Sequence, residues 1–140
     1  MSLLFKVFDT EESRINFMLG CIRVANCNDE LHENEKDFII DAATGLGLND
    51  HKKEELYAVM YRGFKRTQIS FKTRQQEILF MKEVIDLCYY DGTYDSREKQ
   101  EIGFLAEELN IPKNAVDKIE EWILEGIEWN KKGEYLLNNL

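Results

Sequence analysis

Three carboxylates lie close together in the segment 91–98, which reads Asp-Gly-Thr-Tyr-Asp-Ser-Arg-Glu. Asp95 and Glu98 are three residues apart, so they share one face of a helix that begins here, and Asp91 can fold back across the turn. Hard oxygen ligands of this kind suit Ca²⁺ or Mg²⁺ better than they suit soft transition metals. The spacing therefore makes Asp91, Asp95 and Glu98 candidate ligands for Ca²⁺ or Mg²⁺.

The same residues have a purely structural interpretation. An Asp followed three residues later by a Glu, ahead of a periodic apolar run, is a capping box, and Asp-Gly is a common helix stop. The segment is not an EF-hand loop, because the glycine falls at the second position from Asp91 and not at the sixth. Capping and cation binding do not exclude each other, and the sequence leaves both open.

No group of residues in the sequence indicates an enzyme. The two histidines, His32 and His51, fall in different predicted turns, and the sequence contains no nucleophile elbow, phosphate loop or His-Glu-x-x-His motif. Three cysteines, none of them in a CxxC pair, indicate reduced thiols and not a disulfide framework or a zinc site. We therefore expect a non-catalytic protein.

The segment 56–76 carries five cations and no acidic residue, interleaved with Tyr57, Tyr61, Phe64 and Phe71. Such a composition can bind phosphates or stack on nucleic-acid bases. The favoured interpretation is a solvated connection whose aromatic side chains face the core. The alternatives are a nucleic-acid or phosphate binder and a contact patch for an acidic protein surface, which includes a second copy of this chain. The cations are Arg62, Lys65, Arg66, Lys72 and Arg74.

Composition limits the classes of partner. The chain has 140 residues, which fits one domain over 1–140, and 18 Lys and Arg against 27 Asp and Glu give a net charge of −9. That charge disfavours nucleic acid and anionic membrane surfaces, so protein partners or cations are expected. The N-terminal apolar run has no basic segment before it, and no stretch is apolar enough to span a bilayer, so we expect a cytoplasmic protein without a transmembrane segment.

An internal repeat organises the chain. A shift of 63 positions aligns Ile15–Leu48 with Ile78–Ile111 without a gap and gives nine identical pairs, among them Glu35 with Glu98. The two units span about 15–64 and 78–127. A pseudo-twofold axis between the units could bring the acidic turn of the first unit beside that of the second, which makes Glu35 a fourth candidate ligand.

Each unit is predicted to form three helices. Apolar residues recur at spacings of three and four throughout, and no segment alternates with the period of a strand. The fold class is therefore all-α, with about six main helices in two duplicated half-bundles and a short N-terminal piece. The predicted core consists of Ile15, Met18, Ile22, Ile39, Ala43, Ile78, Met81, Ile85, Ile102, Leu105, Ala106, Leu109, Ile119 and Ile123.

Two tryptophans stand seven residues apart near the C-terminus. Trp122 and Trp129 share one face of the last predicted helix. The favoured interpretation is that they pack in the core, and the alternative is an exposed stripe that binds a partner.

The residues around the second acidic turn resemble a known family. A Tyr-Asp-Gly sequence, a hydrophobic residue two positions later, Glu98 and the run Ile102-Gly-Phe-Leu-Ala-Glu-Glu-Leu109 are similar to the TerB-like family, over roughly 15–127. That family includes the tellurite-resistance protein TerB and the N-terminal domain of certain membrane-anchored J-domain co-chaperones. The resemblance implies a duplicated helical domain, an acidic cluster that takes a divalent cation, and a stress-response role beside protein partners, often membrane-associated. The first unit departs from the pattern, because Asn28-Asp29 replaces Asp-Gly.

Overall fold

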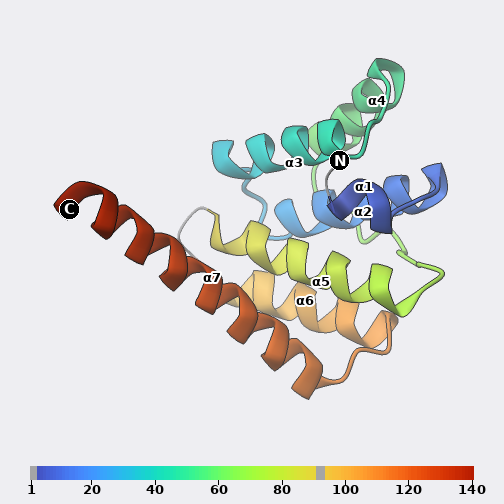
Figure 1. Cartoon of the computed structure of the whole chain (residues 1–140). Helices are drawn as coiled ribbons and strands as arrows, with labels where there is room; N and C mark the ends of the chain where they lie inside the picture. The colour runs from blue at the N-terminus through green and yellow to red at the C-terminus, as the bar shows by residue number, and fades with distance from the viewer. Residues whose placement is uncertain (1–2, 91–93) are drawn as a thin grey trace.

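The computed structural model describes residues 3–90 and 94–140, and this part of the chain is built from helices, turns and irregular connections (Figure 1). The predicted all-α class is confirmed. A short helix precedes six main ones, as the sequence indicated. The helices are α1 (Leu3–Val7), α2 (Glu11–Ala25), α3 (Glu33–Gly45), α4 (Asp50–Tyr61), α5 (Arg74–Tyr89), α6 (Ser96–Glu108) and α7 (Lys113–Asn139).

Helices α2 and α5 pack against each other in the middle of the molecule (Figure 1). Helices α3 and α4 pack on α2, and helices α6 and α7 pack on α5. Each central helix therefore contacts the two helices that follow it in the chain. Helix α7 runs along α5 and continues past it, so the C-terminus lies away from the body. Within the described residues no helix combines the length and the apolar character needed to cross a membrane.

The C-terminal turns of α3 and α6 have the same hydrogen bonds and backbone conformation at residues 63 positions apart, which is the predicted spacing of the repeat. The N–H of Leu48 donates to the carbonyl of Ala43 at 3.3 Å, and that of Ile111 donates to the carbonyl of Ala106 at 2.8 Å. Gly47 and Asn110, the equivalent residues in these turns, both have positive φ, at 68° and 55°. The local equivalence agrees with the repeat, while the pseudo-twofold arrangement of whole units stays a prediction.

The predicted core is confirmed almost residue by residue. Twelve of its fourteen members are buried, and the other two, Ile15 and Ile78, are half-buried and pack against the same cluster. Phe8, Phe17, Phe71 and Phe80 form a connected aromatic group in its centre, with ring centroids 4.8–6.0 Å apart. One continuous core therefore joins helices α2, α3 and α4 to helices α5, α6 and α7.

The close approach of α2 and α5 depends on Gly20. A Cβ atom added at this glycine would overlap with Cε1 and Cζ of the Phe80 ring. The Phe80 side chain is fully buried and contacts Phe17 and Phe71, so it cannot move aside without disturbing both. At the equivalent position of the second unit the chain has Glu83, so the requirement for glycine belongs to α2 alone.

The substitution Gly20→Ala should lower the free energy of unfolding by about 1–3 kcal/mol, because it overpacks the contact between α2 and α5. The control is Gly103→Ala on the exposed side of α6, where no atom lies within 4 Å of an added Cβ. This control should raise stability by about 0.4–1 kcal/mol, because alanine restricts the unfolded chain. Equilibrium unfolding in urea measures both changes. A Gly20→Ala variant as stable as the control would refute the packing requirement.

Candidate functional site

The second acidic turn starts helix α6 with a capping box. An Asp95 side-chain oxygen accepts a hydrogen bond from the Glu98 N–H at 2.8 Å, and a Glu98 oxygen accepts one from the Asp95 N–H at 3.0 Å. The Glu98 side chain is fully buried. The capping interpretation of Asp95 and Glu98 is thus confirmed, while Asp91, the third candidate ligand, lies outside the described residues.

The two acidic turns contact each other. The side-chain amide of Asn28 donates to the second oxygen of Asp95 at 2.9 Å, and Arg97 pairs with Asp29 at 3.3 Å. Burial alone would raise the pKa of Asp95, but the hydrogen bonds from the Glu98 N–H and from Asn28 outweigh it and hold that pKa below its ordinary value. The first unit therefore takes part in the second turn, through Asn28.

Glu35 occupies the equivalent position in the first unit. One of its oxygens accepts a hydrogen bond from the His32 N–H at 3.1 Å at the start of α3, and its side chain is fully buried. Burial raises the pKa of the Cys88 thiol, and the negative charges of Glu98 and Glu35 raise it further. Burial raises the pKa of Cys27 to about 12, and the charges of Glu98 and Glu35 contribute there as well. The two buried glutamates thus act on the same pair of thiols.

These residues give only partial support for a cation site. Both side-chain oxygens of Asp95 already accept hydrogen bonds. Among residues 3–90 and 94–140, no group of three or more His, Cys, Asp or Glu side chains is placed to hold a metal ion. A metal site made of Asp91, Asp95, Glu98 and Glu35 therefore needs the Asp91 carboxylate as a ligand, because the other three residues do not form a metal-binding group by themselves.

Much of the basic segment serves the fold. Arg66 forms an ion pair with Glu101 at 2.8 Å, and Arg74 donates to the carbonyls of Leu109 and Asn110 at 3.1 and 2.8 Å. The Phe71 ring packs against Phe8 and Phe80 in the aromatic core. Phe71 thus faces the core, as the favoured interpretation expects, but Tyr61 and Phe64 are 66% and 38% exposed, so that interpretation is confirmed only in part. The contacts of Arg66 and Arg74 leave fewer cations for a phosphate ligand.

Arg66 joins a buried ion-pair network that the sequence analysis did not identify. Arg23, in the last turn of α2, is 1% exposed, and its Nε lies 2.6 Å from Glu101. Its Nη1 donates to Glu108 at 2.8 Å and to the Thr67 carbonyl at 3.1 Å. Burial alone would raise the pKa of Glu101, but hydrogen bonds from Arg66 and Arg23 hold that pKa below its ordinary value. The only sequence signal was an arginine on the apolar face of a helix.

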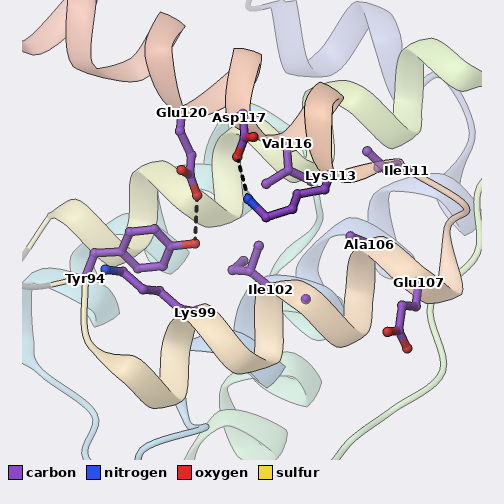
Figure 2. A pocket seen from close by; sticks show the side chains of 11 residues that line it. Tyr94, Lys99, Ile102, Ala106, Glu107, Ile111, Lys113, Val116, Asp117 and Glu120 are labelled. Carbon is purple, nitrogen blue, oxygen red and sulfur yellow. Dashed lines mark hydrogen bonds and ion pairs between the residues drawn. The ribbon is translucent and has the colours of Figure 1, made fainter.

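A groove of about 560 Å³ runs between α6 and α7 (Figure 2). Its floor is apolar and comes from both helices and the turn between them: Ile102, Ala106, Ile111 and Val116. Charged side chains stand around the floor: Lys99, Glu107, Lys113, Asp117 and Glu120. Such a concave, mostly apolar surface with a few polar groups is typical of a binding site.

The polar groups at this groove are held by one another. The Tyr94 hydroxyl donates to Glu120 at 3.2 Å, and the Lys99 ammonium lies 5.2 Å from the centre of the Tyr94 ring. Burial raises the pKa of Tyr94, and the charge of Glu120 raises it further. Tyr94 is therefore a hydrogen-bond donor at neutral pH and fixes Glu120 at one end of the groove (Figure 2).

The two tryptophans do not pack in the core. Trp122 is 50% exposed and Trp129 is 76% exposed, so the interpretation as core residues is wrong. Only Ile119 and Ile123 of α7 are buried. The alternative, an exposed stripe on the last helix, agrees with these exposures.

Comparison of the chain with protein-family models, with curated proteins and with solved structures finds no match. The TerB-like resemblance therefore stays a prediction that rests on the residues of the second acidic turn and the run 102–109.

The Arg23 network should matter more for stability than a surface ion pair. Glu101→Gln leaves the buried Arg23 with Glu108 as its remaining carboxylate partner and should cost about 3 kcal/mol of unfolding free energy. The matched control, Arg66→Gln, removes a half-exposed partner of the same carboxylate and should cost about 1 kcal/mol or less. Chemical denaturation measures both, and equal losses would contradict a special role for the buried pair.

The same pair predicts a pH dependence. The lowered pKa of Glu101 in the folded state means that its contribution is present above the unfolded carboxyl pKa of about 4.3 and is lost as the pH falls through the folded value. The stability gap between the wild type and Glu101→Gln should therefore stay constant near neutral pH and close only below about pH 4. A gap that already closes near neutral pH would refute this assignment.

Proposed function

We propose that this protein is a non-catalytic helical interaction module that binds a segment of a partner protein in the groove between α6 and α7. The observation that carries the proposal is the groove itself, with its apolar floor and its rim of charged side chains. Its size suits one or two aliphatic side chains of a bound segment, which would gain about 25 cal/mol for each Å² of apolar surface removed from water.

The charges at the rim favour a basic segment. Lys113 already pairs with Asp117 at 3.5 Å, and Lys99 lies against the Tyr94 ring, so both lysines have contacts within the protein. Glu107 is exposed at the opposite end of the groove from Tyr94 (Figure 2). The chain as a whole carries a net charge of −9, which attracts a basic partner over a distance. The expected ligand is an aliphatic anchor flanked by Lys or Arg.

Selection from a random peptide library on the intact protein tests the proposal. Peptides with an aliphatic residue next to Lys or Arg should be enriched, and their affinity for Gly103→Arg should fall at least tenfold. Gly103 lines the groove and has open space beside it, so the variant should fold and obstruct the site.

The matched control is Ala58→Arg on the exposed side of α4, which adds the same charge far from the groove and should leave binding unchanged. Enriched peptides that bind both arginine variants as tightly as the wild type would exclude the groove as the site.

Cation binding at the acidic turn, in a stress-response context of the TerB-like kind, is the second candidate. Two observations favour it: Glu35 and Glu98 are fully buried at equivalent helix starts, and Asn28 joins the first turn to Asp95. Asp95, Glu98 and Glu35, with Asp91, are the residues that would hold Ca²⁺ or Mg²⁺. A bound cation would tie the two turns together and stabilise the fold.

Thermal unfolding separates this candidate from pure capping. Asn caps a helix about as well as Asp, and Gln serves in a capping box, so Asp95→Asn with Glu98→Gln should keep the fold. If the turn binds a cation, Ca²⁺ or Mg²⁺ at 100 times the dissociation constant stabilises the wild type by about 2.7 kcal/mol and the double variant by little. If the cation shifts the unfolding temperatures of the wild type and the double variant equally, the turn is only a helix cap. The same conclusion follows if millimolar cation shifts neither of them after chelator treatment.

A further inference from the structure

A second surface of α7 lies away from the groove. Trp122, Gly126, Trp129, Gly133 and Leu136 follow one another at alternating spacings of four and three residues. This is the heptad spacing of helices that pack along their length. Trp122, Trp129 and Leu136 are 50%, 76% and 40% exposed, so each keeps an accessible apolar surface, and the Lys82 ammonium lies 5.5 Å from the Trp122 ring. At 100° per residue, this stripe is on roughly the opposite side of α7 from the groove residues Val116 and Glu120.

Large and small residues alternate in this stripe. No atom lies within 4 Å of a Cβ added at Gly126 or at Gly133, so each glycine leaves an open notch beside a tryptophan. A parallel helix in register would place tryptophan against tryptophan and glycine against glycine. An antiparallel copy of the same helix places Trp129 over Gly126 and Trp122 over Gly133, and the reverse, so all four layers have similar volume.

The flanking charges fit the same arrangement. Glu125 and Lys132 follow the stripe on one side, on the same edge of the helix. In the antiparallel register that pairs tryptophan with glycine, Glu125 of each copy comes opposite Lys132 of the other, which gives two opposite-charge pairs. In a parallel pair, Glu125 would instead come opposite Asn130, which carries no charge.

The body of the protein extends the apolar surface next to Trp122. A shallow hollow of about 390 Å³ there is lined by apolar residues and by two polar ones: Leu3, Val7, Ile78, Leu79, Trp122, Arg74 and Gln75. Leu136 of a second copy would lie at this hollow, since it follows Gly133 by one turn. Covering Trp122 and Trp129 of both copies would remove four large, partly exposed aromatic side chains from water, and these would supply most of the apolar burial in the interface.

We propose that two copies of this chain associate through antiparallel contact of their α7 helices, with each Trp129 seated on Gly126 of the other copy. The part of α7 that continues past α5 makes this contact accessible without a change in the body (Figure 1). The dimer leaves both α6–α7 grooves open, because they lie on the other side of α7. It does not depend on the proposed peptide binding.

Sedimentation equilibrium of the full chain, from micromolar to millimolar concentration, tests the dimer and its register. Glu125→Lys should weaken dimerisation about tenfold, because it replaces two opposite-charge pairs with two like-charge pairs. Lys132→Glu should weaken it similarly, and the double variant Glu125→Lys with Lys132→Glu should restore it. The matched control, Glu128→Lys, makes the same charge change on a different face of α7 and should leave the dimer unchanged.

Trp129→Ala, at a position that is 76% exposed, should weaken dimerisation at least a hundredfold, because two central side chains are lost. Circular dichroism checks that α7 stays helical in every variant. A chain that is monomeric at all concentrations, or that binds lipid vesicles as a monomer, overturns the proposal. So does a dimer in which Glu125→Lys behaves like Glu128→Lys, or in which the double variant is not restored. Gly103→Arg should dimerise normally, which separates this result from a failure of the groove.

Discussion

The fold depends on how closely α2 and α5 approach at Gly20. The absence of a side chain there lets the Phe80 ring lie directly on the α2 backbone. Phe17 and Phe71 pack against that ring, and Phe8 packs against both of them. All other main helices pack on one or both of these two. A wider separation of α2 and α5 would open the centre of the only contiguous core found among the described residues, and cavities in a core cost stability in proportion to their size.

A network of buried charged side chains lies at the edge of this core and links α2 to α6. Arg23 on α2 forms ion pairs with Glu101 and Glu108 on α6. The Glu101 carboxylate also pairs with Arg66, which lies in the connection between α4 and α5. A buried arginine is expensive to desolvate, so it tolerates few arrangements of its partners. We infer that the network fixes α6 relative to α2. Since α6 is one wall of the groove, this would also fix the shape of the groove.

Helix α7 shows how one amphipathic element can serve several surfaces. Ile119 and Ile123 bury one face against the body, Val116 and Glu120 line the groove, and Trp122 and Trp129 form an exposed stripe on a third face. Helix α4, its counterpart in the predicted repeat, ends at Tyr61 after 12 residues, whereas α7 has 27. The additional length is not needed to cover α5, so the exposed apolar residues on it are available for contacts with other molecules.

The sequence alone determined the all-α class, the positions of the main helices and nearly the whole core, because helical periodicity and capping residues are local signals. The capping box formed by Asp95 and Glu98 could be predicted for the same reason. The ion pair of Arg23 with Glu101 joins residues 78 positions apart, and no local pattern encodes such a distance. The exposure of Trp122 and Trp129 was also beyond the sequence, because spacing puts two side chains on one face without saying what covers that face. Only the packing of α7 against α5 decided that the isoleucines turn inward and the tryptophans face outward.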